Sequence, residues 1–251
     1  MLAVAFSSPC LRGENPTFEV ATIKPVEPEA KAGRYILMQG NNRFVVKNYT
    51  LKLLVAAAYD ISSKVISGGP AWLEADRFDI VALTPGDAKP PRQQQMAMLR
   101  ALLADRFKLA FHREQRFFSI YELSVAGSGS KLKRSTAPDS EPAALISTVY
   151  PDHIHLPARN ASMTEFVSLL QRAVLDRPVV DRTGLAGKYD FNLDWAPDET
   201  QFGGEVPVAP ADAPSPPFFL AIEQQLGLHV LAKRGPAEAL VVDSAQKPSA
   251  D

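Results

Sequence analysis

The sequence predicts an α+β fold made of two pseudo-symmetric repeats. Each repeat is expected to run strand-strand-helix-strand-helix-strand-strand, with a mostly antiparallel sheet. Three observations lead to this prediction. Segments that alternate apolar and polar residues, as half-buried strands do, recur along the whole chain. The order of elements in the first half returns in the second half. A hydrophobic fraction of 46% with 22% charged residues is typical of globular proteins.

The elements of the first half follow from local patterns. Pro25 ends the first alternating segment, and Gly40-Asn41-Asn42 makes a hairpin-type turn between the next two. Asn48 or Thr50 offers an N-cap for a helix that ends near Tyr59. The strands are expected at 18–24, 35–38, 43–46, 77–83, 107–111 and 118–125, and the second helix at 93–105. The charged residues 112–116 are expected to form a turn between the last two strands.

The second half runs the same course. Helices are expected from Asn160 or Ser162 onward and over 218–226, each with an apolar stripe. The last two strands are expected to close as a hairpin. The predicted strands are 146–150, 153–156, 189–195, 228–232 and 239–243.

The two halves can be laid on each other. Asn48 falls on Asn160, Asp79 falls on Asp190, and 98–124 matches 217–243 without a gap. The predicted organisation is therefore a first repeat over 17–135 and a second repeat over 143–245. Segment 1–16 precedes them and the tail 246–251 follows. The short apolar start of the chain has two interpretations, the remnant of a secretory leader and a disordered terminus.

Composition excludes several classes of function. A net charge of −1 gives no basic surface for nucleic acid. The single cysteine, Cys10, rules out an intramolecular disulfide, and no zinc-finger spacing occurs. No apolar run approaches the roughly 20 residues of a transmembrane helix. Phosphate-binding glycine loops and the Gly-x-Ser-x-Gly elbow are missing from the sequence. A small-molecule ligand or substrate is the partner that remains, and the sequence does not fix the oligomeric state.

A set of motifs, taken in order, resembles a family of uncharacterised, secreted soil-bacterial proteins. The motifs are Phe18–Pro25, Ile66–Leu73, Asp76–Asp79, Leu102–Leu109, Arg177–Leu185 and Lys188–Phe191. The resemblance covers residues 17–249 and implies a secreted or periplasmic location. In some relatives a similar domain is attached to a membrane sensor of the antirepressor-peptidase type, which implies a binding or sensing role. The resemblance carries over no catalytic residues.

Metal ligation is one chemistry that the residues suggest. His153 and His155 lie on one face of a predicted strand, and with Asp152 and Asp194 they form a candidate metal set. Two histidines and a carboxylate suit zinc, whereas the acidic residues after Tyr189 suit calcium. No cofactor is specified, and a divalent cation is the one that these residues would hold. The alternative is a hairpin with exposed polar side chains.

Carboxylates are the candidates for catalysis. Asp79 and Asp190 occupy equivalent places in the two repeats, so a two-fold arrangement would pair them and raise one pKa. The alternative is that each anchors a local turn or pairs with a nearby base. Asp181 lies with Arg182 on a Gly-flanked turn that is echoed in the first repeat, but the Asp181-Arg182 pair itself has no counterpart there. Its catalytic role competes with simple anchoring of that turn.

Aromatic residues supply candidate binding positions. Trp72, Tyr189 and Trp195 are expected to line a ligand surface with Arg182, or else to lie in the core. Two functions remain open. The first is an extracytoplasmic small-molecule binding or sensor-type module, with its ligand in the cleft between the repeats. The second is a secreted hydrolase of small esters or lactones, such as acyl-homoserine lactones, using a divalent metal. A purely structural role ranks third.

Overall fold

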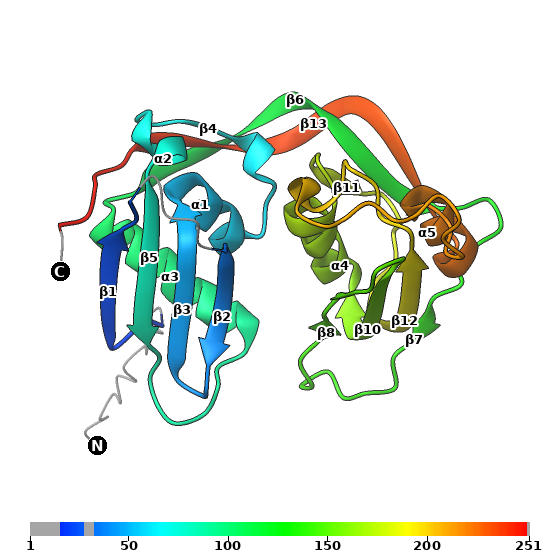
Figure 1. Ribbon diagram of the computed structural model, residues 1–251, viewed down its shortest axis with the longest axis horizontal. Coiled ribbons are helices and arrows are strands. Elements are labelled where there is room, and N and C mark those ends of the chain that lie inside the picture. The colour runs from blue at the N-terminus through cyan, green and yellow to red at the C-terminus, as the bar shows by residue number, and fades with distance from the viewer. Residues whose placement is uncertain (1–15, 28–32, 250–251) are drawn as a thin grey trace, which may run out of the picture.

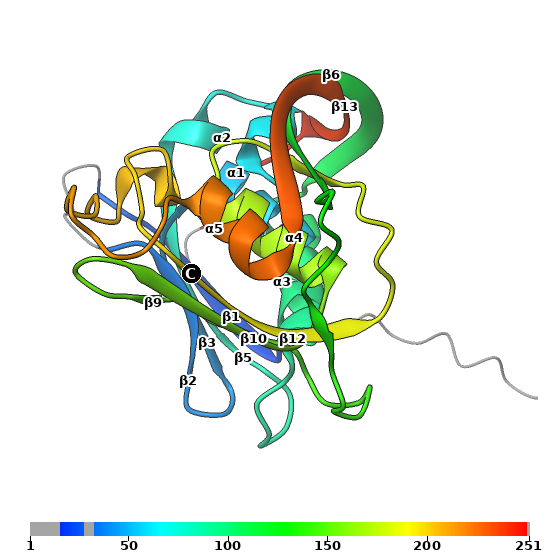
Figure 2. The same ribbon diagram turned by 90° about the vertical axis from the view of Figure 1, so that its right-hand side faces the viewer.

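The computed structural model describes residues 16–27 and 33–249. Two lobes lie side by side, and two long strands arch over both of them (Figure 1). In each lobe the sheet lies on one side and the main helices lie on the other (Figure 2). The combination of helices with mostly antiparallel sheets confirms the predicted α+β class. The leader or disordered terminus predicted over 1–16 lies almost entirely outside the described residues.

The first lobe contains a four-stranded antiparallel sheet in the order β1-β5-β3-β2. Its strands are β1 (Val20–Pro25), β2 (Tyr35–Gln39), β3 (Arg43–Thr50) and β5 (Arg77–Leu83). Its helices are α1 (Leu51–Tyr59), η1 (Ser63–Val65), α2 (Trp72–Ala75) and α3 (Arg92–Arg106). The Thr50 hydroxyl caps α1 by accepting a hydrogen bond from the Leu53 N–H at 3.3 Å. The apolar faces of α1 and α3 pack with the inner face of the sheet to form one core.

The second lobe contains a sheet in the order β7-β12-β10-β8, with β9 also paired to β10. Its strands are β7 (Lys133–Arg134), β8 (Ala144–Leu145), β9 (Thr148–Val149), β10 (Ile154–Ser162) and β12 (Lys188–Trp195). Its helices are α4 (Met163–Leu169), the π-helix η2 (Leu170–Val174), η3 (Phe202–Gly204) and α5 (Phe218–Leu226). Ser162 and Glu165 form a capping box that starts α4.

The third sheet joins the lobes. β6 (Ala110–Val125) and β13 (Leu228–Ser244) pair antiparallel over nearly their whole length. We call this pair the ribbon. At one end β11 (Val179–Asp181) pairs parallel with β6, and at the other end β4 (Ile66–Gly68) pairs parallel with β13. The ribbon therefore crosses from one lobe to the other and has a short strand added at each end.

The ribbon corrects the prediction of separate strands and hairpins at the end of each half. Residues 112–116 are not a turn, and 228–232 with 239–243 do not close on each other; both stretches belong to continuous strands. Phe107 is the C-cap of α3, so the strand begins at Ala110. The middle of the ribbon spans the gap between two cores, so charged side chains cost little there. Its backbone groups are satisfied by the partner strand.

Each lobe completes its core with the long strand of the other half. Leu240 and Val242 of β13 lie in the core of the first lobe. Tyr121 and Leu123 of β6 lie in the core of the second lobe. Burying these side chains stabilises each lobe only when both halves of the chain are present. None of the helices in the described part of the chain has the length and apolarity needed to cross a membrane.

Candidate functional site

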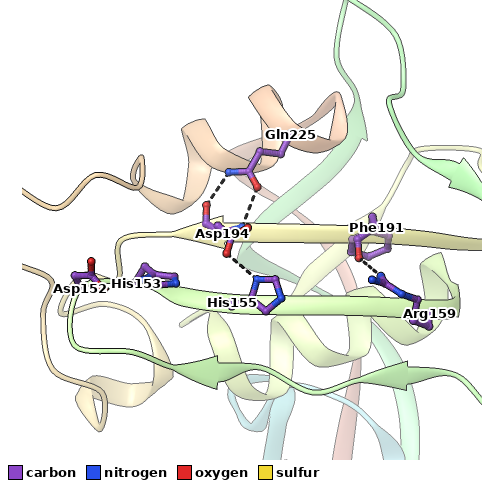
Figure 3. A network of polar contacts seen from close by, with 7 residues as sticks. All are labelled: Asp152, His153, His155, Arg159, Phe191, Asp194 and Gln225. Carbon is purple, nitrogen blue, oxygen red and sulfur yellow. Dashed lines mark hydrogen bonds and ion pairs between the residues drawn. The ribbon is translucent and has the colours of Figure 1, made fainter.

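A polar network lies on the outer face of the second sheet (Figure 3). His155 Nδ1 lies 2.7 Å from Asp194 Oδ1 on the neighbouring strand. An ionised carboxylate can only accept, so His155 Nδ1–H is the donor in this contact. The Gln225 side chain of α5 binds the Asp194 backbone twice, at 2.9 and 2.7 Å. The pair is therefore held in place by a second element.

The predicted metal set is divided between two separate pairs. His153 Nδ1 lies 2.7 Å from Asp152 Oδ1, and the ring stacks on Tyr150 with centroids 4.5 Å apart. This contact lowers the pKa of Asp152 through a hydrogen bond from the imidazole. Each histidine thus engages its own carboxylate. Across residues 16–27 and 33–249, no three His, Cys, Asp or Glu side chains are grouped to hold a metal ion.

Asp79 and Asp190 lie in different sheets and anchor equivalent irregularities. β3 and β10 each contain a bulge at an asparagine with positive φ, Asn48 at 61° and Asn160 at 50°. Asp79 Oδ1 accepts the Asn48 N–H at 2.9 Å, and Asp190 Oδ1 accepts the Asn160 N–H at 2.8 Å. A bulged residue loses its hydrogen-bond partner on the neighbouring strand, so the carboxylate accepts the asparagine backbone N–H that the sheet leaves unpaired. The structure gives both residues a role in the scaffold.

Asp181 anchors its own turn. Its Oδ1 accepts hydrogen bonds from the Thr183 backbone N–H at 2.8 Å and from the Thr183 hydroxyl at 2.7 Å. Side chains of this type commonly stabilise turns in this way. The bond network of Asp181 is therefore local, while the next residue, Arg182, faces the space between the lobes.

The predicted aromatic residues belong to two cores. Trp72 packs edge-on against Phe78 in the first lobe, with centroids 6.2 Å apart. Tyr189 is buried in the core of the second lobe. Trp195 is fully buried there, and its Nε1–H donates to Gln201 Oε1 at 2.7 Å. Tyr189 and Trp195 therefore act as core residues, Trp72 packs partly exposed against the other core, and the three do not share one ligand surface.

A cavity of about 360 Å³ lies between the lobes and the ribbon. We call it the interlobe pocket. The first lobe contributes Ile61 and Val65 to its wall, and the ribbon contributes Gln115, Pro236, Ala237 and Glu238. The second lobe contributes Gln171, Pro178, Val179, Val180 and Arg182. Mostly apolar side chains with a few polar groups are typical of small-molecule sites.

Gln171 closes one wall of the interlobe pocket. It lies on the π-helix η2, a type of turn that occurs often at functional sites. Its Nε2 donates to the Asp60 carbonyl of the first lobe at 2.9 Å, and its Oε1 accepts the Val179 N–H at 3.3 Å. One side chain therefore ties the wall of the pocket to both lobes.

Arginines gather beside this wall. Arg92 lies 2.5 Å from Asp60, and Arg172 lies 3.7 Å from the same carboxylate. Burial, reinforced by the neighbouring Arg92, lowers the pKa of Arg172 to about 10. Arg34 pairs with Glu205 of the other lobe at 2.5 Å. The Arg172–Asp60 and Arg34–Glu205 contacts join the two lobes, and the first of them lies beside Gln171 of the interlobe pocket.

A second cavity, of about 560 Å³, lies at the end of the first sheet. Of its charged wall residues, Arg34 pairs with Glu205 and Glu74 with Lys52, while Arg77 donates to the Asn48 side chain at 3.4 Å. Its wall also includes Gly33, next to residues outside the described chain. The interlobe pocket, whose wall comes from three separate units, is therefore the stronger candidate site.

A family model described as a protein of unknown function (DUF3738) matches residues 52–245, which is most of the chain. The chain belongs to the DUF3738 family. No curated protein and no protein of known structure matches it significantly. The match spans the pocket-lining residues of both lobes and of the ribbon, so the site lies within the part that defines a DUF3738 protein.

Sequence reasoning found Arg182 of this DUF3738 pocket and missed the other wall residues. Gln115 lies in a charged stretch that predicts a turn, and Gln171 lies on a π-helix that no periodicity indicates. The available signal was the predicted cleft between the two repeats. The residues that line such a cleft cannot be identified until the pairing of β6 with β13 is known.

Proposed function

We propose that the protein is a small-molecule-binding module whose ligand occupies the interlobe pocket. One observation carries the proposal: the first lobe, the second lobe and the ribbon all contribute to the pocket wall. Ligand sites occur preferentially at such interfaces, and the cavity of about 360 Å³ is of the size that small ligands use. Apolar side chains together with two glutamine amides, Arg182 and Glu238 suit a ligand with an apolar body and a few polar atoms.

Contact with both lobes supports a sensor-type role. A ligand that touches Ile61 on one side and Val179 on the other binds best when the lobes hold one spacing. Differential affinity of this kind shifts a population of conformations toward the bound spacing. Gln171 and Asp60 already bridge the lobes at the pocket wall, so a ligand there would strengthen or replace this contact.

A thermal-shift screen of a metabolite library tests the proposal. Ala237→Trp fills the pocket from the ribbon, while Ala232→Trp places the same side chain at an exposed position of the same strand. We expect hits that stabilise the wild type and Ala232→Trp but not Ala237→Trp. Hits that stabilise all three proteins equally would place the site elsewhere, and a screen without hits would reject the proposal. Far-UV circular dichroism checks that both variants fold.

We also propose that the protein acts outside the cytoplasm, in the periplasm or as a secreted protein. The support is the resemblance of its ordered motifs to secreted soil-bacterial proteins. Fractionation of cells that express the natural gene, with mass spectrometry of the mature N-terminus, tests this location. Intact protein found only in the cytoplasm would reject it.

The two halves, we infer, are structural duplicates related by a two-fold axis through the ribbon. Phe117 pairs with Pro236, and the sequence alignment places these same two positions on each other. Ile66 pairs with Leu240 just as Val179 pairs with Tyr121. The bulges at Asn48 and Asn160 add a further match. An experimental structure in which the two lobes do not superpose would reject the duplication.

A further inference from the structure

We propose that the ligand of the interlobe pocket is an organic anion with an apolar body, whose carboxylate binds Arg182. This inference rests on the proposed function and names the ligand class of the same site. It depends on how the charges around the pocket are paired. Two arginines at or beside the pocket wall are second partners of carboxylates that another base already holds.

Arg182 is the first of these arginines. Its Nε lies 3.9 Å from Glu122, at the limit of an ion pair. Lys233 holds the same carboxylate at 2.5 Å. The Arg182 side chain lines the pocket and is 60% exposed, whereas that of Glu122 is 22% exposed. Two cations therefore share one carboxylate, and Arg182, which is the more distant of the two, is the one that lines the pocket.

Arg172, the residue after Gln171, repeats this arrangement at Asp60. Arg92 holds Asp60 at 2.5 Å, which leaves Arg172 at 3.7 Å from that carboxylate. Arg172 is only 28% exposed, so water compensates its charge poorly. Its lowered pKa agrees with a desolvated cation that lacks a full counter-charge. Arg172 does not line the pocket itself, but it adds a second positive charge next to the wall residue Gln171.

The acidic residue of the pocket wall does not cancel the positive charge of Arg182. Glu238 lines the wall, but the Arg113 guanidinium binds its carboxylate directly. The rest of the wall is largely apolar, with valine, isoleucine, alanine and proline side chains. A simple inorganic anion would leave the apolar side chains of the pocket wall in contact with water. A carboxylate on an apolar body would satisfy Arg182 and bury apolar surface at the same time.

Titration calorimetry with octanoate and its uncharged counterpart octanamide tests the ligand class, with phenylpropionate and its amide as an aromatic pair. We expect the acid to bind at least 10-fold more tightly than its amide in at least one pair. Arg182→Gln should abolish that preference. Arg43→Gln removes the same charge from the far end of the first sheet and should leave the preference unchanged.

Two further variants test the charge arrangement by the direction in which each changes the affinity for the acid. Glu122→Gln removes the carboxylate that Arg182 shares, so affinity for the acid should rise several-fold. Lys233→Gln frees Glu122 to pair fully with Arg182, so affinity should fall. Opposite or absent changes would overturn the assignment of Arg182.

The outcomes separate this inference from the proposed function. If no acid binds better than its amide while Ala237→Trp still blocks a compound from the library screen, the pocket binds ligands but the anion inference is wrong. If only neutral or cationic library compounds bind there, the inference is equally wrong. If nothing binds the wild type, the proposed function fails first, and the inference fails with it.

Discussion

Replacing Asp190 with alanine should destabilise the protein through the bulge in β10. Asp190 Oδ1 accepts the Asn160 N–H at 2.8 Å, and Asn160 is 1% exposed, so water cannot replace the lost acceptor. A buried donor left without a partner costs about 1–3 kcal/mol. For a protein of this size we expect Tm to fall by roughly 2–4 °C per kcal/mol. Chemical denaturation followed by circular dichroism gives the change in unfolding free energy.

Two matched variants sharpen this prediction. Asn192→Ala changes an exposed residue of the same strand and should cost less than about 0.5 kcal/mol. Asp190→Asn keeps an oxygen acceptor and should cost less than Asp190→Ala. Equal stability of Asp190→Ala and Asn192→Ala would refute the anchoring role and would reopen a functional role for Asp190.

Three further predictions follow from the packing and the ionisable groups. Gly68→Ala should lower the unfolding free energy by about 2 kcal/mol more than Gly86→Ala, as measured by chemical denaturation. A Cβ at Gly68 would lie 2.6 Å from the Val242 carbonyl oxygen, whereas at Gly86 it would meet no described atom within 4 Å. Both glycines have positive φ, so similar costs would show that packing against β13 is unimportant. Fragments 1–140 and 141–251 should fold only when co-expressed, since each core includes a long strand from the other half, and a cooperative unfolding transition of either fragment alone would contradict this. Burial raises the pKa of the Tyr49, Tyr59 and Tyr121 phenols above their ordinary value of 10.0, so the folded state keeps protons that the unfolded chain releases. The contribution of these phenols to the unfolding free energy is complete below about pH 10 and declines as pH rises. In urea titrations, the triple Tyr→Phe variant should therefore lose stability less steeply than the wild type between about pH 10 and about pH 11.5.

Much of the local structure could be predicted from the sequence. The hairpin of β2 and β3, the start of α1 at Thr50 and the start of α4 at Ser162 depend on turn and capping residues close by in the chain. The ribbon could not be predicted in the same way. Its middle lies outside both cores, so residues 112–116 show no apolar alternation, and their partners lie more than 100 residues away.

The candidate site was less accessible to sequence reasoning for the same reason. Its wall comes from short segments of two lobes and of the ribbon, and pairing over long sequence distances brings them together. Motif reasoning favoured His153, His155 and the carboxylates of one strand, which are close in sequence. These residues form local pairs or support bulges. Arg182 was singled out because the Asp181-Arg182 pair has no counterpart in the first half.

The most direct test of the interlobe pocket is methyl NMR of isoleucine-labelled protein during titration with octanoate. Ile61 lines the pocket, while Ile23 and Ile154 lie in the cores of the two lobes and serve as internal references. We expect the Ile61 methyl signal to shift in a saturable way while the two reference signals stay in place. A saturable shift of Ile23 or Ile154 with Ile61 unmoved would contradict binding between the lobes.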